Sequence, residues 1–239
     1  MERKKYEFTG ETIKHLGLTL RRIRAIVPVG SVAAGTVGGW IENEKNLAQV
    51  YGDAWVYGDA HVYGDAQVYG NAGVYGNAKV YGDAGVYGDA GVYGNAWVYG
   101  NAGVSGNAHV SGNAGVHGNA QVSGNAQVSG DAQVYGDAGV YGNAWVSGNA
   151  HVSGDAHVYG DAQVEIRIIC ATRSDGYTFL VTPMASGSTH IIAGCRNFTF
   201  SEAREHWTRT RGGTPLGDES LALVDHLERM ASIVFKKGS

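Results

Sequence analysis

Cysteine, proline and long apolar runs are scarce in this chain of 239 residues. No stretch approaches the roughly 18 consecutive apolar residues of a membrane span. The basic start, residues 1–9, has no apolar run behind it and so does not resemble a secretory signal peptide. The two cysteines, Cys170 and Cys195, allow a single pair, which is too few for a disulfide framework. We therefore expect a cytoplasmic protein with reduced thiols and no membrane contact.

Glycine, in contrast, is abundant: 38 residues, more than twice the usual share of about 7%. Glycine-rich chains are often disordered or collagen-like. Here, however, no Gly-X-Y period is present and 44% of the residues are hydrophobic. The composition therefore excludes both classes and allows the chain to bury a core.

The charge is distributed unevenly along the chain. Residues 51–164 carry nine Asp and one Lys, a net charge of about −8, whereas residues 1–50 carry 8 basic and 5 acidic side chains and residues 165–239 carry 9 basic and 8 acidic ones. An acidic wall repels a nucleic-acid backbone. We therefore expect no nucleic acid along the middle segment, and we expect any anionic ligand to bind at the ends.

The middle segment is an unbroken repeat with a period of six, Tyr/Ser/His-Gly-Asp/Asn-Ala-x-Val, from residue 51 to residue 164. Nineteen copies are present. Gly, Ala and Val are invariant among them at the second, fourth and sixth positions, while the third position is Asp in nine copies and Asn in ten. The first position is Tyr in twelve copies, and the fifth is Trp, His, Gln, Gly or Lys.

Each position of the repeat has a physical interpretation. Valine is β-branched, and its neighbours are variable, so the fifth, sixth and first positions predict a short strand with Val facing inward. Gly followed by Asn or Asp predicts a tight corner, because Asn and Asp accept a left-handed backbone conformation better than other non-glycine residues. Ala then fills a corner that has no room for a larger side chain. Alternating short strands and corners predict a closed coil.

This pattern resembles the hexapeptide repeat of left-handed β-helix proteins, including acyltransferase-like and polymer-forming proteins of bacteria and prophages. The resemblance implies three repeats per triangular coil, and therefore about six coils. The segment GTVGGWIENEKNLA (residues 35–48) resembles the N-terminal module of some of these proteins. Residues 191–223, with GCRNFTFSEAREHW and TRGGTPLGDESLAL, resemble the C-terminal cap of some of them. The predicted fold class is mainly β, a left-handed parallel β-helix with a cap at each end.

The two ends differ from the repeat and are expected to cap it, because a solenoid exposes unpaired strand edges. Residues 1–50 predict a β-hairpin with a turn at residues 15–17, followed by an irregular first coil. Residues 165–239 predict a small α+β cap with strands at 165–172, 177–182 and 189–193 and a hairpin turn at 174–176. Ser201 and Asp218 are the expected N-caps of two helices.

The resemblance implies acyl transfer with a histidine base, but acyltransferases of this class place the base beside a loop that leaves the coil. No insertion interrupts these 114 residues, so we expect no catalytic residue. The repeat histidines are not stacked at one-coil spacing, and we expect neither a metal site nor a cofactor. These histidines are His61, His109, His117, His151 and His157.

Rows of tyrosines are one candidate binding surface. Stacking every third repeat aligns them into ladders, which would either bind sugars, bases or partner proteins or simply cover neighbouring backbone. The ladder residues are Tyr57, Tyr75 and Tyr93 in one row and Tyr63, Tyr81 and Tyr99 in another.

Basic residues at the ends are the second candidate. Cations beside an aromatic ring suit an anion or a nucleotide, although the same residues would also serve to dock the caps. The predicted ligand-binding residues are Arg196, His206, Trp207 and Arg211 at one end, and Arg21 and Arg22 at the other.

The regularity of the repeat favours a non-catalytic solenoid that acts as a rigid scaffold or binding module, with specific contacts at the caps. We expect a homo-oligomer, with a protein partner or a small anionic ligand at the basic caps, and the resemblance suggests a phage origin. Two alternatives stay open. One is a hexapeptide-type acyltransferase, and the other is a phage counter-defence module that sequesters a small anion or nucleotide.

Overall fold

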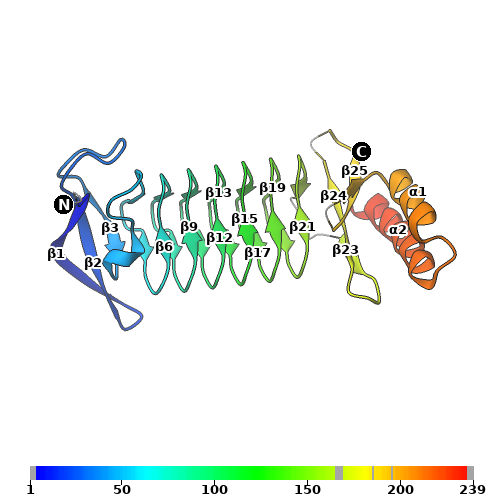
Figure 1. Ribbon diagram of the computed structural model, residues 1–239, viewed down its shortest axis with the longest axis horizontal. Helices are drawn as coiled ribbons and strands as arrows, with labels where there is room; N and C mark the ends of the chain where they lie inside the picture. Colours follow the sequence, from blue (N-terminus) through cyan, green and yellow to red (C-terminus); the bar gives the residue numbers. More distant parts are fainter. Residues whose placement is uncertain (1–3, 165–168, 185, 195, 236–239) are drawn as a thin grey trace.

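The computed structural model describes residues 4–164, 169–184, 186–194 and 196–235. Figure 1 shows an elongated molecule with a β-hairpin at one end, a stack of short coils in the middle and two helices at the other end. The N-terminal hairpin and the C-terminal helices therefore lie at opposite ends of the long axis.

Every copy of the repeat forms one two-residue strand from its fifth and sixth positions. Each strand from the first copy to the sixteenth pairs in parallel with the strand eighteen residues further on, for example Val98 with Val116. The strands are β4 (Trp55–Val56), β5 (His61–Val62), β6 (Gln67–Val68), β7 (Gly73–Val74), β8 (Lys79–Val80), β9 (Gly85–Val86), β10 (Gly91–Val92), β11 (Trp97–Val98), β12 (Gly103–Val104), β13 (His109–Val110), β14 (Gly115–Val116), β15 (Gln121–Val122), β16 (Gln127–Val128), β17 (Gln133–Val134), β18 (Gly139–Val140), β19 (Trp145–Val146), β20 (His151–Val152), β21 (His157–Val158) and β22 (Gln163–Val164).

These strands lie in three sheets, in which every third strand is a neighbour: β5-β8-β11-β14-β17-β20, β4-β7-β10-β13-β16-β19-β22 and β6-β9-β12-β15-β18-β21. The prediction of a three-sided parallel β-helix is confirmed. Strand β3 (Val37–Ile41) continues the first sheet by pairing in parallel with β5, and Leu47 bridges to Val68 in the third. The stack therefore has about seven turns.

The core is a column of small side chains. All nineteen sixth-position valines and all nineteen fourth-position alanines are buried. The left-handed backbone conformation belongs to the repeat glycines, whose φ angles run from +57° to +74°, and Leu16 is the one non-glycine residue with positive φ in the described chain. The expectation that Asn or Asp adopts it was wrong. From Gly52 to Gly142, each repeat glycine packs against the glycine one coil further on, so that a Cβ at Gly100 would lie 3.0 Å from the carbonyl oxygen of Gly118.

Asn and Asp instead form hydrogen-bonded ladders along the corners. Nine Asn side chains donate through Nδ2 to Oδ1 of the Asn or Asp one coil further on, over 2.8–3.2 Å, as Asn119 does to Asp137. A carboxylate cannot donate, so each ladder ends where an Asp occurs. The two residue types are therefore not interchangeable at this position.

The N-terminal cap is the predicted hairpin, β1 (Tyr6–His15) and β2 (Leu18–Ala25), which is antiparallel and turns at Leu16 and Gly17 as expected. Strand β2 also pairs antiparallel with β3, so the hairpin extends the first sheet of the coil. A short 3-10 helix, η1 (Glu44–Asn46), forms the corner before Leu47.

The C-terminal cap is an antiparallel sheet covered by two helices. Its strands are β23 (Ile169–Thr172), β24 (Thr178–Pro183), β25 (Thr189–Ala193) and β26 (Arg196–Phe198), and its helices are α1 (Phe200–Arg211) and α2 (Pro215–Val234). One face of the sheet, with Leu180 and Ile192, packs on the solenoid core, and the other, with Phe179 and Val181, packs on the helices.

Three details of this cap differ from the prediction. The N-caps are Thr199 and Thr214, not Ser201 and Asp218, because each threonine hydroxyl accepts an N–H from the first turn. Strand β26 was not predicted. The first half of the expected strand at 165–172, like Cys195, lies outside the described residues, while Cys170 is an exposed free thiol.

Candidate functional site

A cleft of about 840 Å³ opens in the C-terminal cap. It lies between the β23–β24 hairpin, β26, the second half of α1 and the start of α2, and all four C-terminal residues predicted to bind a ligand line it. The fold thus brings together residues that are up to 15 positions apart in sequence. They are Arg196, His206, Trp207 and Arg211.

Two of these residues are free cations. Arg196 and Arg211 are exposed, and within the described chain neither makes an ion pair. Thr214, Pro215 and Leu216, the N-cap and first residues of α2, line the same cleft. The start of a helix presents N–H groups without intrahelical acceptors and a partial positive charge, both of which favour an anion. The cleft is therefore electropositive at its rim.

The other two predicted residues are largely structural. Trp207 is buried in the cap core, with its ring tilted against Phe179. His206 is buried between Phe198, at 5.0 Å between ring centroids, and Trp207, at 4.8 Å. Burial, and then the nearby Arg196 and Arg209, lower the pKa of His206. His206 is therefore neutral at pH 7 and adds no charge to the cleft.

The floor of the cleft holds an ion pair that the sequence did not reveal. Arg173 is buried and donates through Nε and Nη2 to both carboxylate oxygens of Asp175, at 2.8 and 2.6 Å, and through Nη1 to Ser220 at 2.9 Å. Its guanidinium also lies over the ring of Trp207, at 5.5 Å. These bonds lower the pKa of Asp175 to about 2. The turn at Asp175 is visible in the sequence, but the contact with α1 is not.

The predicted basic pair at the N-terminal end does not converge. Arg21 and Arg22 are neighbours on β2, so their side chains leave opposite faces. The guanidinium of Arg21 lies 5.2 Å from the ring of Phe8, whereas that of Arg22 lies 4.8 Å from Trp40 and 3.8 Å from the carboxylate of Asp59. These arginines pack on aromatic rings, and strand β2, which carries them, lies at the opposite end of the molecule from α1 and α2 (Figure 1).

The tyrosine ladders form, but unevenly. Tyr63, Tyr81 and Tyr99 stack at 5.0 and 4.9 Å between centroids, and His117 and Tyr135 continue the row. In the other row Tyr57 stacks on Tyr75 at 4.2 Å, whereas Tyr93 meets His109 edge-on.

Several of these rings cover backbone. A Cβ at Gly73 would lie 2.3 Å from the ring of Tyr75, so this tyrosine folds over the glycine two residues before it. Burial raises the pKa of both Tyr57 and Tyr63 to about 12. The geometry fits the packing interpretation for these rings.

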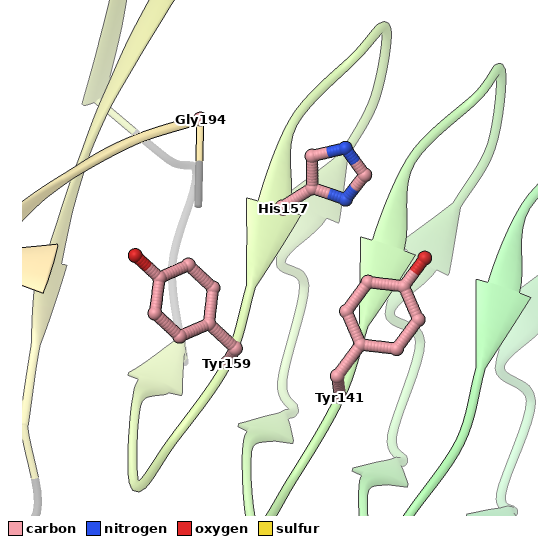
Figure 2. Close-up of a pocket in the computed structure, with 4 residues that line it drawn as sticks. All are labelled: Tyr141, His157, Tyr159 and Gly194. Atoms are coloured by element: carbon pink, nitrogen blue, oxygen red, sulfur yellow. The ribbon is translucent and has the colours of Figure 1, made fainter. Parts of the chain in front are cut away.

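A second hollow, of about 490 Å³, lies where the last coils meet the C-terminal cap. Figure 2 shows Tyr141 and His157 side by side from neighbouring coils, and Tyr159 between the last coil and Gly194 of the cap. The rings of Tyr141 and His157 are stacked, with centroids 5.8 Å apart. Its described lining is aromatic and contains one imidazole and no carboxylate that could orient or charge that imidazole.

Among the described residues, no group of three or more His, Cys, Asp or Glu side chains is arranged to hold a metal ion. Neither of the helices there is long and apolar enough to cross a membrane.

Comparison with known proteins relates the chain to one family of repeats. The family model of the YdcK β-solenoid repeat matches residues 48–64, 66–82, 120–136 and 132–148, all within the stacked coils or at their start. No curated protein matches the chain. With three sheets of parallel strands and repeats similar to the YdcK β-solenoid repeat, the chain is a β-helix repeat protein.

Proposed function

We propose that this protein is a non-catalytic binding module in which a rigid β-helix carries an anion-binding cleft at its C-terminal end. The observation that supports this proposal is the position of Arg196 and Arg211, two cations that lie in one cleft beside the start of α2 and form no ion pair with any described residue. The ligand class is a small anion with phosphate or carboxylate groups, such as a nucleotide.

Two physical features favour this ligand. A guanidinium donates two parallel N–H groups to a phosphate or carboxylate, which gives orientation as well as attraction. The carboxylate of Asp175 lines the cleft too, but it is bonded on both oxygens to Arg173, so the pair is close to neutral. The acidic wall of the coils, in turn, repels anions and leaves the cap as the favoured end.

The histidine at the cleft gives acyl transfer little support. His206 is the one that borders the cleft, but it is wedged between two aromatic rings. A general base must reach the proton that it removes, within about 3 Å or through one water. We therefore propose binding, or sequestration of the ligand, without turnover.

The test is isothermal titration calorimetry of the full chain with inorganic phosphate, pyrophosphate and ADP, at low and high salt. We expect one of these probes to bind, and both Arg196→Gln and Arg211→Gln to weaken its binding about tenfold through loss of a charge-assisted hydrogen bond. Arg209→Gln is the matched control, since Arg209 is an exposed arginine in the same last turn of α1 but does not line the cleft. Absence of binding, or equal weakening by the control, would overturn the proposal.

A further inference from the structure

A third hollow, of about 500 Å³, lies on the outer wall of the β-helix, in the middle of the stacked coils and away from both caps. Gly115 forms its floor, Trp97 and Gln133 stand on either side along the coil axis, and Tyr99 borders it. The corner ladder of Asn95, Asn113 and Asp131 completes the rim. It shares no residue with the cleft in the C-terminal cap.

The hollow arises from the register of the fifth repeat position. Lys79, Trp97, Gly115 and Gln133 are paired in that order across β8, β11, β14 and β17. Their side chains therefore point outward in one column, which is interrupted at Gly115. The ammonium group of Lys79 lies 5.6 Å from the centroid of the Trp97 ring and occupies the upstream side, while Gly115 lies on the downstream side.

Trp97 is costly to expose. Its side chain is 49% exposed, the highest value of the five tryptophans, whereas Trp40, Trp55 and Trp207 are buried. An aromatic ring exposed beside a hollow is a common feature of binding sites. Here the ring is next to Gly115, where the column lacks a side chain and the hollow opens.

The rim supplies hydrogen-bonding groups without a cation. Asn95 donates to Asn113, and Asn113 donates to Asp131 at 2.9 Å, so the ladder ends in a carboxylate acceptor. The amide of Gln133 lies over Gly115, where its Oε1 would be 2.3 Å from a Cβ, and is held by a single 3.4 Å contact to the carbonyl of Asp131. A weakly held amide can turn toward a ligand at low cost.

An aromatic face, an amide and a carboxylate together match the two sides of a sugar ring. The C–H face of a pyranose packs on an indole, and its hydroxyl groups both donate to a carboxylate and accept from an amide. The carboxylate of Asp131 and the acidic wall disfavour anionic ligands. We propose that the hollow formed by Trp97, Gly115 and Gln133 binds a neutral saccharide unit, with its ring stacked on Trp97 and its hydroxyl groups bonded to Gln133 and Asp131.

The repeat provides matched controls for both walls. Gln121 lies over Gly103 on another sheet in the same way as Gln133 lies over Gly115. Its Oε1 would be 2.4 Å from a Cβ at Gly103, and its Nε2 is 3.4 Å from the carbonyl oxygen of Asn119. The strand neighbours of Gly103 are Gly85 and Gln121, so no tryptophan is adjacent in this column. Trp145 is 43% exposed, but its indole N–H donates to Ser129 and its column neighbours are Gln127 and Gln163.

The experiment uses the full chain on an array of neutral, N-acetylated and sialylated oligosaccharides and nucleosides, followed by calorimetry with the neutral oligosaccharide that binds best. We expect retention of neutral glycans and loss of about tenfold in affinity for Trp97→Ala, in line with the value of an aromatic contact. Gly115→Ser fills the hollow from a backbone without positive φ and should abolish binding. Thermal melting of each variant verifies folding.

Three results would overturn the proposal: no neutral glycan retained, preferential binding of nucleosides or sialylated glycans, or equal weakening by Trp145→Ala or Gln121→Ala. Arg211→Gln should leave saccharide binding unchanged. The proposal for the anion-binding cleft and the proposal for this hollow can therefore be supported or overturned independently.

Discussion

Among single residues, we expect the buried sixth-position valines to contribute more to the stability of the coil than the fifth-position side chains that are exposed. Val98 is fully buried and pairs with Val80 and Val116, so Val98→Asp places an unpaired charge in a column of methyl groups. We expect a loss of about 3–5 kcal/mol in the free energy of unfolding. Gln127 is exposed, and Gln127→Ala should change it by less than about 0.5 kcal/mol. Urea denaturation followed by circular dichroism measures both changes, and similar values would contradict the buried column.

A second residue-scale prediction concerns acid stability at the N-terminal cap. The ring of His15, at the end of β1, meets the ring of His61 in β5 at 4.7 Å. Burial, followed by the nearby His15 and Lys79, lowers the pKa of His61 to about 4, and burial also lowers that of His15. Both rings are thus neutral in the folded protein at pH 7, where they pack the hairpin onto the first coil.

The direction of the pH effect follows from these shifts. Because the unfolded chain takes up protons first, near pH 6.5, stability is fully present above that pH and falls as the pH drops toward about 4. Because His61 is only half-buried, we expect this loss in the free energy of unfolding to be about 1–2 kcal/mol. Melting of His61→Gln should show a smaller loss between pH 7 and pH 4.5 than the parent, whereas His151→Gln, at the same repeat position five coils away, should melt like the parent.

Among elements, the corner ladders explain why both Asn and Asp occur at the third position. Asn119→Asp removes the bond to Asp137 and brings two carboxylates together. We expect it to destabilise the protein by about 1 kcal/mol. Asp89→Asn has the opposite sign, because it keeps the bond from Asn71 and adds a donor toward Asn107. It should stabilise by a few tenths of a kcal/mol, and thermal melting at low and high salt would separate hydrogen bonding from charge.

The same elements indicate what sequence can and cannot predict. The coil was predictable because Val, Ala and Gly are invariant in nineteen copies, which specifies strand, core and corner together. Which residue of the corner adopts the left-handed conformation could not be predicted, since Gly is adjacent to Asn or Asp and all three accept it. The helix starts were missed although signals existed: Thr199 with Glu202 is a capping box, and Thr214 precedes a proline at the first helical position.

The candidate sites depend on contacts that no local pattern encodes. Arg196 and Arg211 could be selected from the sequence as cations near an aromatic residue. The role of Arg173 could not, because it depends on the packing of the β23–β24 hairpin against α1. The hollow at Gly115 requires knowledge that Trp97 and Gln133 are its neighbours at eighteen-residue spacing. Once three repeats per coil are known, that column can be read from the sequence directly.

For the whole molecule, the three-sided coil predicts that its length and its twist respond differently to deletions. Asp65 and Asp155 lie on the same corner, five coils apart, and both are exposed. Spin labels on cysteines at these two positions, in a chain with Cys170 and Cys195 replaced by Ser, should be about 24 Å apart along the axis at about 4.8 Å per coil.

Deleting the eighteen residues 75–92 removes one complete coil and joins Val74 to Tyr93 in phase, so every remaining strand keeps its face. The labels stay on one corner, and the axial separation should fall to about 19 Å. Deleting only residues 75–80 removes one side of the triangle and moves the second label to a different corner. The two labels then no longer lie above one another, so the offset between two corners adds to an axial separation of about 22 Å. The distance measured by pulsed electron resonance should therefore exceed that axial value. A six-residue deletion that shortens the distance only in proportion to the residues removed, as the eighteen-residue deletion does, would be incompatible with three repeats per turn.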